Sequence, residues 1–134
     1  IDLWFTLIDN KSGNFDIINP DWRGRDILFS DVIIHLLYGG SKVSIIYRPD
    51  MRSDVFVSML KEKAKENNVF ENLTIIQREL KHNKGILTDH GSLSGSMNFT
   101  YTGVEISEEL IQYDIDISRV DKDKIEFEED YGKI

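Results

Sequence analysis

The chain has 134 residues, a formal net charge of −8, 40% apolar residues and no cysteine. This length is enough for a single domain with a buried core, and the lack of cysteine excludes disulfide bonds and thiolate metal sites. No apolar run is long enough to span a membrane and no signal peptide is evident, so we expect a cytoplasmic protein without membrane insertion.

Apolar runs separated by turn residues predict the elements of the first half of the chain. Residues 3–8 and 15–18 are short runs that indicate strands, each followed by residues typical of turns. Residues 27–38 are apolar nearly all round and end in two glycines, which indicates a largely buried helix. Residues 42–47 alternate and are rich in β-branched residues, which predicts a third strand.

The following elements continue this alternation. Ser53 and Asp54 can cap a helix that extends over residues 53–66, and residues 73–77 follow as a strand. Residues 110–115 indicate a further strand. Because strands and helices alternate, parallel pairing is favoured, and the sequence predicts an α/β layer fold.

The acidic residues are concentrated in the last part of the chain. Residues 105–134 contain 11 acidic and 4 basic residues, whereas residues 1–104 contain 13 acidic and 12 basic residues. We interpret residues 118–134 as an acidic tail that forms a surface helix, packs against a partner or is disordered. Because the sequence begins at Ile1 rather than Met, a piece of a longer protein with further domains or partner proteins is also expected.

Residues 81–98 combine side chains that can act together on a phosphoryl group. The pattern consists of His82, Lys84, Asp89, Gly95, Ser96 and Asn98. His82 and Lys84 are two residues apart, so an extended strand would present both on one face, and the same holds for Ser96 and Asn98. A nucleophile, a cation, a hydroxyl and an amide donor in one place can attack a phosphoryl group and stabilise its charge.

The pattern HxKxxxxD followed by GSxN resembles the HKD signature of the phospholipase D superfamily, which includes nucleases and lipases. The resemblance covers roughly residues 15–113, and the pattern occurs once. Five residues separate Asp89 from Gly95 where the family usually has six, which predicts a tighter turn over residues 90–94. The resemblance implies a single phospholipase D-like domain over residues 1–134, with a mixed, largely parallel sheet flanked by helices.

The resemblance also implies how the residues divide the chemistry. His82 would form a covalent phosphohistidine, while Lys84 and Asn98 would hold the charged oxygens without a metal ion or cofactor. Glu109 stands eleven residues after Asn98, where the family usually has an acid that orients the histidine. Asp89 is expected to be structural, pairing with a base or capping the turn.

Two further points concern the role of Ser96 and the origin of a second histidine. Ser96 either donates to phosphate or satisfies the backbone of its turn. A second histidine has to protonate the leaving oxygen, and with one pattern in the chain we expect it to be His82 of another subunit in a homodimer. His35 and His90 are poor substitutes for it, because one is predicted to be buried in a helix and the other to lie in a turn. We expect the dimer interface near Phe99 and Tyr101.

Three functions are compatible with these residues. A metal-independent nuclease acting on DNA or RNA is favoured, because small single-motif members of the superfamily mostly act on nucleic acid. A lipid phosphodiesterase or transphosphatidylase is the alternative, although no amphipathic helix for interfacial binding is evident. The third is a phosphate-binding module with little turnover. The basic residues that could line a groove for a nucleic-acid backbone are Arg23, Arg25, Arg48, Arg52, Arg78 and Lys81.

Overall fold

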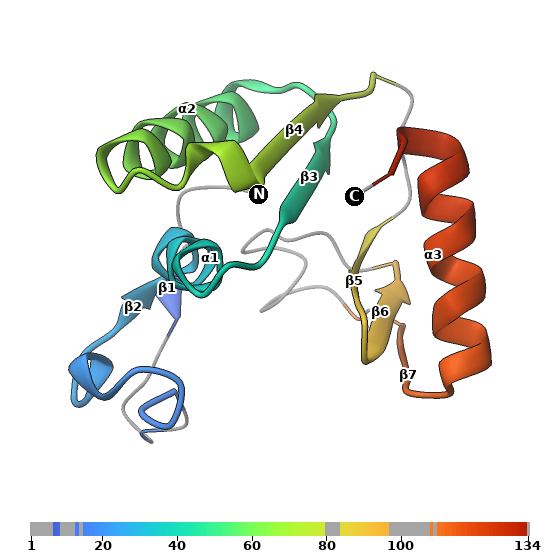
Figure 1. Ribbon diagram of the computed structural model, residues 1–134, viewed down its shortest axis with the longest axis horizontal. Helices are drawn as coiled ribbons and strands as arrows, with labels where there is room; N and C mark the ends of the chain where they lie inside the picture. The colour runs from blue at the N-terminus through green and yellow to red at the C-terminus, as the bar shows by residue number, and fades with distance from the viewer. Residues whose placement is uncertain are drawn as a thin grey trace.

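A computed structural model describes residues 7–8, 13, 15–79, 84–96, 108 and 110–133 (Figure 1). Within these residues the chain is mixed α/β, with three α-helices, two short 3-10 helices and seven strands. The strands form three small sheets in which β1 pairs with β2, β3 with β4, and β5 with β6 and β7. None of the helices in this part of the chain has the length and apolar content of a membrane span.

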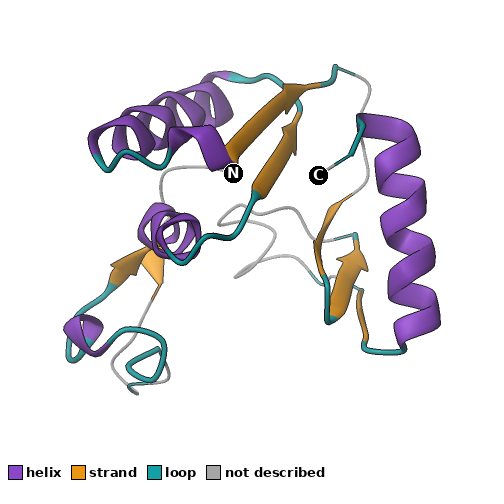
Figure 2. Ribbon diagram, in the orientation of Figure 1, coloured by secondary structure: helices purple, strands orange, loops and turns teal. Residues whose placement is uncertain are grey.

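The parallel pairing expected from the sequence is confirmed for one pair of strands. β3 (Val43–Tyr47) and β4 (Leu73–Gln77) run parallel, with Val43 opposite Leu73 and Tyr47 opposite Gln77. The chain between them forms helix α2 (Met51–Glu66), so the unit is a strand–helix–strand crossover (Figure 2). Such a connection is what parallel strands require, because a tight turn cannot join them.

The hydrophobic core lies between this pair of strands and helices α1 (Phe29–Tyr38) and α2. Its buried residues are Ile33, Leu37, Phe56, Val57, Leu60, Ala64, Val69 and Leu73. The sequence predicts a largely buried helix here, and all residues of α1 except Leu36 and Tyr38 are buried or half-buried; these two are 44% and 67% exposed. Helix α1 buries one face against α2 and β3, and its other face is accessible to solvent.

Helix α2 begins earlier than the sequence indicates, because Asp50 is its N-cap rather than Ser53. The Asp50 carboxylate accepts hydrogen bonds from the backbone N–H groups of Arg52 and Ser53, at 2.9 and 3.0 Å. It thereby satisfies two of the donors that the first turn leaves without a partner. Pro49 precedes this cap and favours an extended backbone at Arg48, the residue before it, so the helix does not extend further toward β3.

The strand expected over residues 15–18 is absent, and these residues form turns. The N–H of Ile18 donates to the carbonyl of Phe15 at 3.0 Å, so a local bond takes the place of a strand ladder. A short 3-10 helix over Pro20–Trp22 follows and buries Trp22 against the half-buried His35, with ring centroids 5.2 Å apart. Of the strand expected over residues 3–8, Leu7–Ile8 is described and pairs as β1 with β2 (Ile27–Leu28).

The C-terminal part is an antiparallel sheet with a helix packed against it. The sheet has the order β5 (Lys84–Thr88), β6 (Gly91–Gly95) and β7 (Ile111–Asp114). Helix α3 (Ile117–Tyr131) contacts β5 and β6 (Figure 1). A largely parallel sheet was expected, but two residues join β5 to β6, and so short a link permits only an antiparallel hairpin.

The segment interpreted as an acidic tail is therefore a helix that belongs to the fold. Asp116 caps it by accepting hydrogen bonds from the N–H groups of Ser118 and Arg119, at 3.0 and 3.3 Å. Val120, in its first turns, is 1% exposed. The surface-helix interpretation is confirmed over Ile117–Tyr131.

Candidate functional site

The hairpin brings the middle of the predicted pattern together. Lys84, the first residue of β5, is directly opposite Gly95, the last residue of β6. The reversal occurs at Asp89 and His90, where the Thr88 hydroxyl accepts the N–H groups of His90 and Gly91 at 3.2 and 3.1 Å. The turn predicted over residues 90–94 is thus wrong, because Gly91–Gly95 is a strand and the shortening falls in a two-residue hairpin turn.

Gly95 and Ser96 form a close contact with the start of β7. A Cβ atom on Gly95 would lie 2.0 Å from the carbonyl oxygen of Leu110, so only glycine fits there without a shift. The next residue, Ser96, donates its N–H to that same oxygen at 3.0 Å. Its hydroxyl accepts the Leu110 N–H at 3.1 Å, which is the backbone role that the sequence left open; a phosphate role for Ser96 stays a prediction.

One side of the sheet carries Lys84 among apolar residues. Residues opposite each other in an antiparallel sheet point to the same side, and the pairing joins β5 to β6 and β6 to β7 in register. We call this side the open face; besides Gly91 and Gly95 it consists of Lys84, Ile86, Thr88, Leu93, Ile111 and Tyr113. Tyr113 is 70% exposed, and Ile86 and Ile111 are each more than 40% exposed. Among the described strand residues of this face, Lys84 is the one charged side chain.

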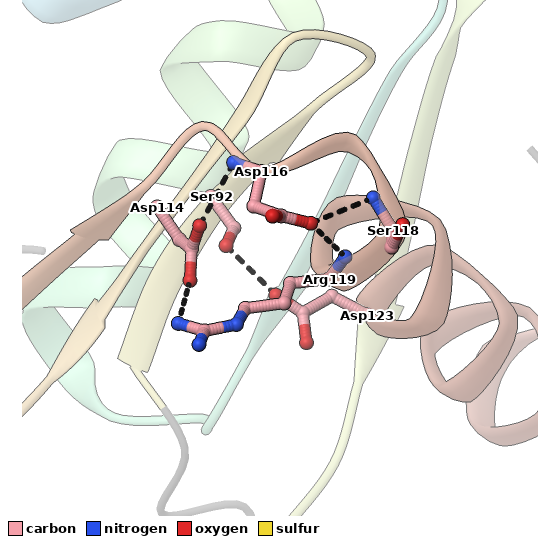
Figure 3. A network of polar contacts seen from close by, with 6 residues as sticks. All are labelled: Ser92, Asp114, Asp116, Ser118, Arg119 and Asp123. Carbon is pink, nitrogen blue, oxygen red and sulfur yellow. Dashed lines mark hydrogen bonds and ion pairs between the residues drawn. The ribbon is translucent and has the colours of Figure 1, made fainter.

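Helix α3 covers the opposite side, where polar bonds attach it to the sheet (Figure 3). The buried Ser92 hydroxyl of β6 donates to the Asp123 carboxylate at 2.7 Å. Asp114 at the end of β7 pairs with Arg119 at 2.9 Å and accepts the N–H of Asp116 at the same distance. These contacts fix the helix to two strands of the sheet that holds Lys84.

Asp89 in the hairpin turn is held by the same helix. Its carboxylate forms an ion pair with the Lys124 ammonium group. The hydrogen bond and charge of Lys124 hold the pKa of Asp89 below its usual value, while Asp89 raises the pKa of Lys124. This arrangement fits the structural role expected for Asp89, since its carboxylate is bonded to a base at the turn.

The other predicted site residues lie outside the described part of the chain. They are His82, Asn98 and Glu109, together with Lys81, Phe99 and Tyr101. Among the described basic residues, Arg48 and Arg78 each follow one strand of the β3–β4 pair, and the Arg78 N–H donates to the Tyr47 carbonyl at 2.9 Å. Arg23 instead pairs with Asp16 at 3.4 Å. Arg48 and Arg78 therefore lie at the same end of one pair of strands, whereas Arg23 lies on a different element; the groove for a nucleic-acid backbone stays a prediction.

Three residues at this sheet were missed from the sequence. Lys124 and Asp123 were part of the charged segment, and Tyr113 was part of a strand without an assigned side. The spacing of Val120, Asp123, Lys124 and Phe127 at helical intervals was the signal for an inward helix face. In the part of the chain that is described, no three His, Asp or Glu side chains are grouped to hold a metal ion.

Comparisons with protein-family models, with characterised proteins and with solved structures found no match for this chain.

Proposed function

We propose that this chain is a metal-independent phosphodiesterase that acts on nucleic acid through a covalent phosphohistidine at His82. The observation that carries this is the pairing of Lys84 with Gly95, residues eleven apart in the sequence that the hairpin makes neighbours. It joins Lys84, the described residue of the HxK half of the pattern, to the Gly-Ser half at one end of the sheet. The chemistry needs both halves at one phosphorus atom.

The contact of Ser96 with Leu110 supports a role for the next acid in the sequence. Leu110 directly follows Glu109, and both backbone groups of Leu110 are bonded to Ser96. The mechanism requires Glu109 to reach His82 and to fix the tautomer of its ring. A backbone bonded to the Gly-Ser end of the hairpin is suited to deliver an acid to that end.

The reaction would proceed in two displacements. A ring nitrogen of His82 attacks phosphorus, the bond to the leaving oxygen breaks, and His82 of the partner subunit gives that oxygen its proton. Water then loses a proton to the same partner histidine and attacks phosphorus, which breaks the nitrogen–phosphorus bond. Lys84 and Asn98 would stabilise the charge on the non-bridging oxygens throughout both steps.

The test is turnover of labelled single-stranded DNA, duplex DNA, RNA and phosphatidylcholine in the presence of EDTA. We expect cleavage of a nucleic acid that survives EDTA, and an acid-labile phosphoryl group on the protein after rapid quenching. His82→Ala should remove both while the circular dichroism spectrum stays that of the wild type. Activity lost in EDTA and restored by magnesium would contradict the mechanism, and turnover of phosphatidylcholine alone would favour a lipid substrate.

A further inference from the structure

The open face contains an aromatic ring that is both exposed and held in place. Tyr113 is 70% exposed, yet the Gly91 backbone beside it is buried. A Cβ atom on Gly91 would lie 3.2 Å from both Cε2 and the hydroxyl oxygen of Tyr113, so the phenolic end of the ring rests on this glycine. A ring supported by a neighbouring strand keeps its orientation and loses little freedom when a ligand binds.

Lys84 is on the same face as this ring and at a definite offset from it. Lys84 is in β5 and Tyr113 in β7, two strands away, and Tyr113 is two residues along from Ile111, which lies in the same row as Lys84. Ordinary sheet spacing then separates the two Cα atoms by roughly 12 Å. An extended single strand of nucleic acid covers that separation in about two nucleotides.

The charges of the sheet are divided between its two sides. The open face presents Lys84, whereas Asp114 is on the side covered by α3 and pairs there with Arg119. Asp89 at the turn is likewise neutralised by Lys124 of that helix. Neither Asp114 nor Asp89, the acidic residues of the described strands and hairpin turn of this sheet, therefore faces Lys84 on the open face, and an anionic ligand can approach this cation despite the negative net charge.

We infer that the open face binds single-stranded nucleic acid, with a base stacked on Tyr113 and a backbone phosphate at Lys84. This rests on the proposed function for the phosphate at Lys84 and adds the strand preference of the substrate. Bases of a single strand can be turned out onto an aromatic ring, whereas those of a duplex are stacked inside it. Ile86, Leu93 and Ile111 lie on the same face and form an apolar surface that the sugar and the neighbouring base can contact.

The experiment measures equilibrium binding of fluorescent oligonucleotides to protein that carries His82→Ala and therefore does not cleave them. Tyr113→Leu removes the ring, Tyr113→Phe keeps it, and Tyr38→Leu changes a tyrosine of similar exposure on α1 as a matched control. The ligands are a single strand, a strand of the same length without bases, and a duplex. Light scattering at the same concentrations follows the oligomeric state.

We expect Tyr113→Leu to weaken binding of the single strand about tenfold or more, since one stacked base contributes that much. Tyr113→Phe and Tyr38→Leu should bind it as the parent does, and the strand without bases should not distinguish the variants. Equal binding by Tyr113→Leu, or an equal loss on the strand without bases, overturns the inference. So does a dimer that becomes monomeric in Tyr113→Leu, because the ring would then cover a second copy of the chain.

The outcomes separate this inference from the proposed function. Binding does not need turnover, so a protein that binds single strands through Tyr113 and never cleaves them contradicts the proposed function alone. A protein that cleaves nucleic acid and is indifferent to Tyr113→Leu contradicts the stacking site alone.

Discussion

Asp89 and Lys124 are 35 residues apart in the sequence and form an ion pair between the hairpin turn and the middle of α3. Together with the Ser92–Asp123 hydrogen bond, this pair attaches the helix to the hairpin turn and to the start of strand β6 that follows it. The charged C-terminal helix is therefore a support for the sheet that carries Lys84. Its charges act locally on the sheet as well as contributing to the net charge.

The first prediction concerns the titration of Asp89. Because Lys124 stabilises the carboxylate in the folded protein, the pKa of Asp89 is below its ordinary 3.8, and the pair contributes stability above that pH. This contribution is lost as the pH falls through the lowered pKa. Lys124→Met should move the Asp89 midpoint up toward 3.8 in an NMR titration of the carboxyl carbon. Lys122→Met, which removes a partner of Glu126 instead, is the control and should leave it in place.

The second prediction is a steric one at Gly95. Because a Cβ atom there would meet the Leu110 carbonyl at 2.0 Å, Gly95→Ala must push β7 away from β6. We expect a loss of about 2 kcal/mol or more in the free energy of unfolding by urea. Gly39→Ala is the matched control, because a Cβ atom there meets Leu36 at an ordinary 3.4 Å, and it should change the stability by less than about 0.5 kcal/mol. Equal stabilities for the two variants would contradict the close contact.

Part of the fold could be predicted because the residues of some segments are enough to specify their secondary structure. The strand expected over residues 73–77 is β4, since a β-branched run lies between turn residues. The strand expected over residues 15–18 did not form, because turn hydrogen bonds satisfied the backbone there and no neighbouring strand was needed. The parallel pairing expected for the last sheet was wrong for a different reason. The alternation of strands and helices stops after Gln77, so the sequence beyond Gln77 gave no support for parallel strands.

The residue pattern of the candidate site could be recognised from its spacing in the sequence. The contacts that depend on packing could not. The pattern from His82 to Asn98 is visible in the sequence, and two of its members, Lys84 and Gly95, are paired by a hairpin whose two-residue turn contains Asp89. The partner of Asp89 was not visible, because Lys124 reads as one more charge in an acidic segment. The side on which Tyr113 lies depends on the register of β7, and a shift of one residue would have turned the ring toward α3.

The third prediction tests how much the hydrogen bond between Ser92 and Asp123 stabilises the packing of α3 on the sheet. Ser92 is buried and its hydroxyl donates to the Asp123 carboxylate, so Ser92→Ala leaves that carboxylate without a partner from β6. We expect a loss of about 1.5 kcal/mol or more in the free energy of unfolding, as for other hydrogen bonds to charged groups. Ser94→Ala changes an exposed serine on the same side of the same strand and should have little effect. Urea unfolding followed by circular dichroism compares the two.

The fourth prediction follows from the role proposed for Glu109. Glu109→Gln would keep the shape of the side chain but weaken its hold on the His82 ring and on the imidazolium that forms in the reaction. We expect kcat to fall about tenfold or more with KM nearly constant, because the acid would face the histidine rather than the phosphate. Glu108→Gln, which changes the neighbouring exposed acid, is the control. An unchanged kcat in Glu109→Gln would mean that its spacing from Asn98 has no catalytic meaning.

The last prediction is the homodimer, which follows from the number of histidines. In the proposed mechanism two histidines act on opposite sides of the phosphorus, and the chain has one histidine within the HxK pattern. The other two are poorly suited, because His35 packs against Trp22 and His90 is in the hairpin turn. Refolding wild-type protein with a ninefold excess of His82→Ala should lower the activity per wild-type subunit about tenfold, because most wild-type subunits then lack a partner histidine. His90→Ala in the same excess should leave the activity per subunit as it is. Full activity from a monomer, shown by light scattering at the assay concentration, would rule out the shared site and require a second histidine from elsewhere.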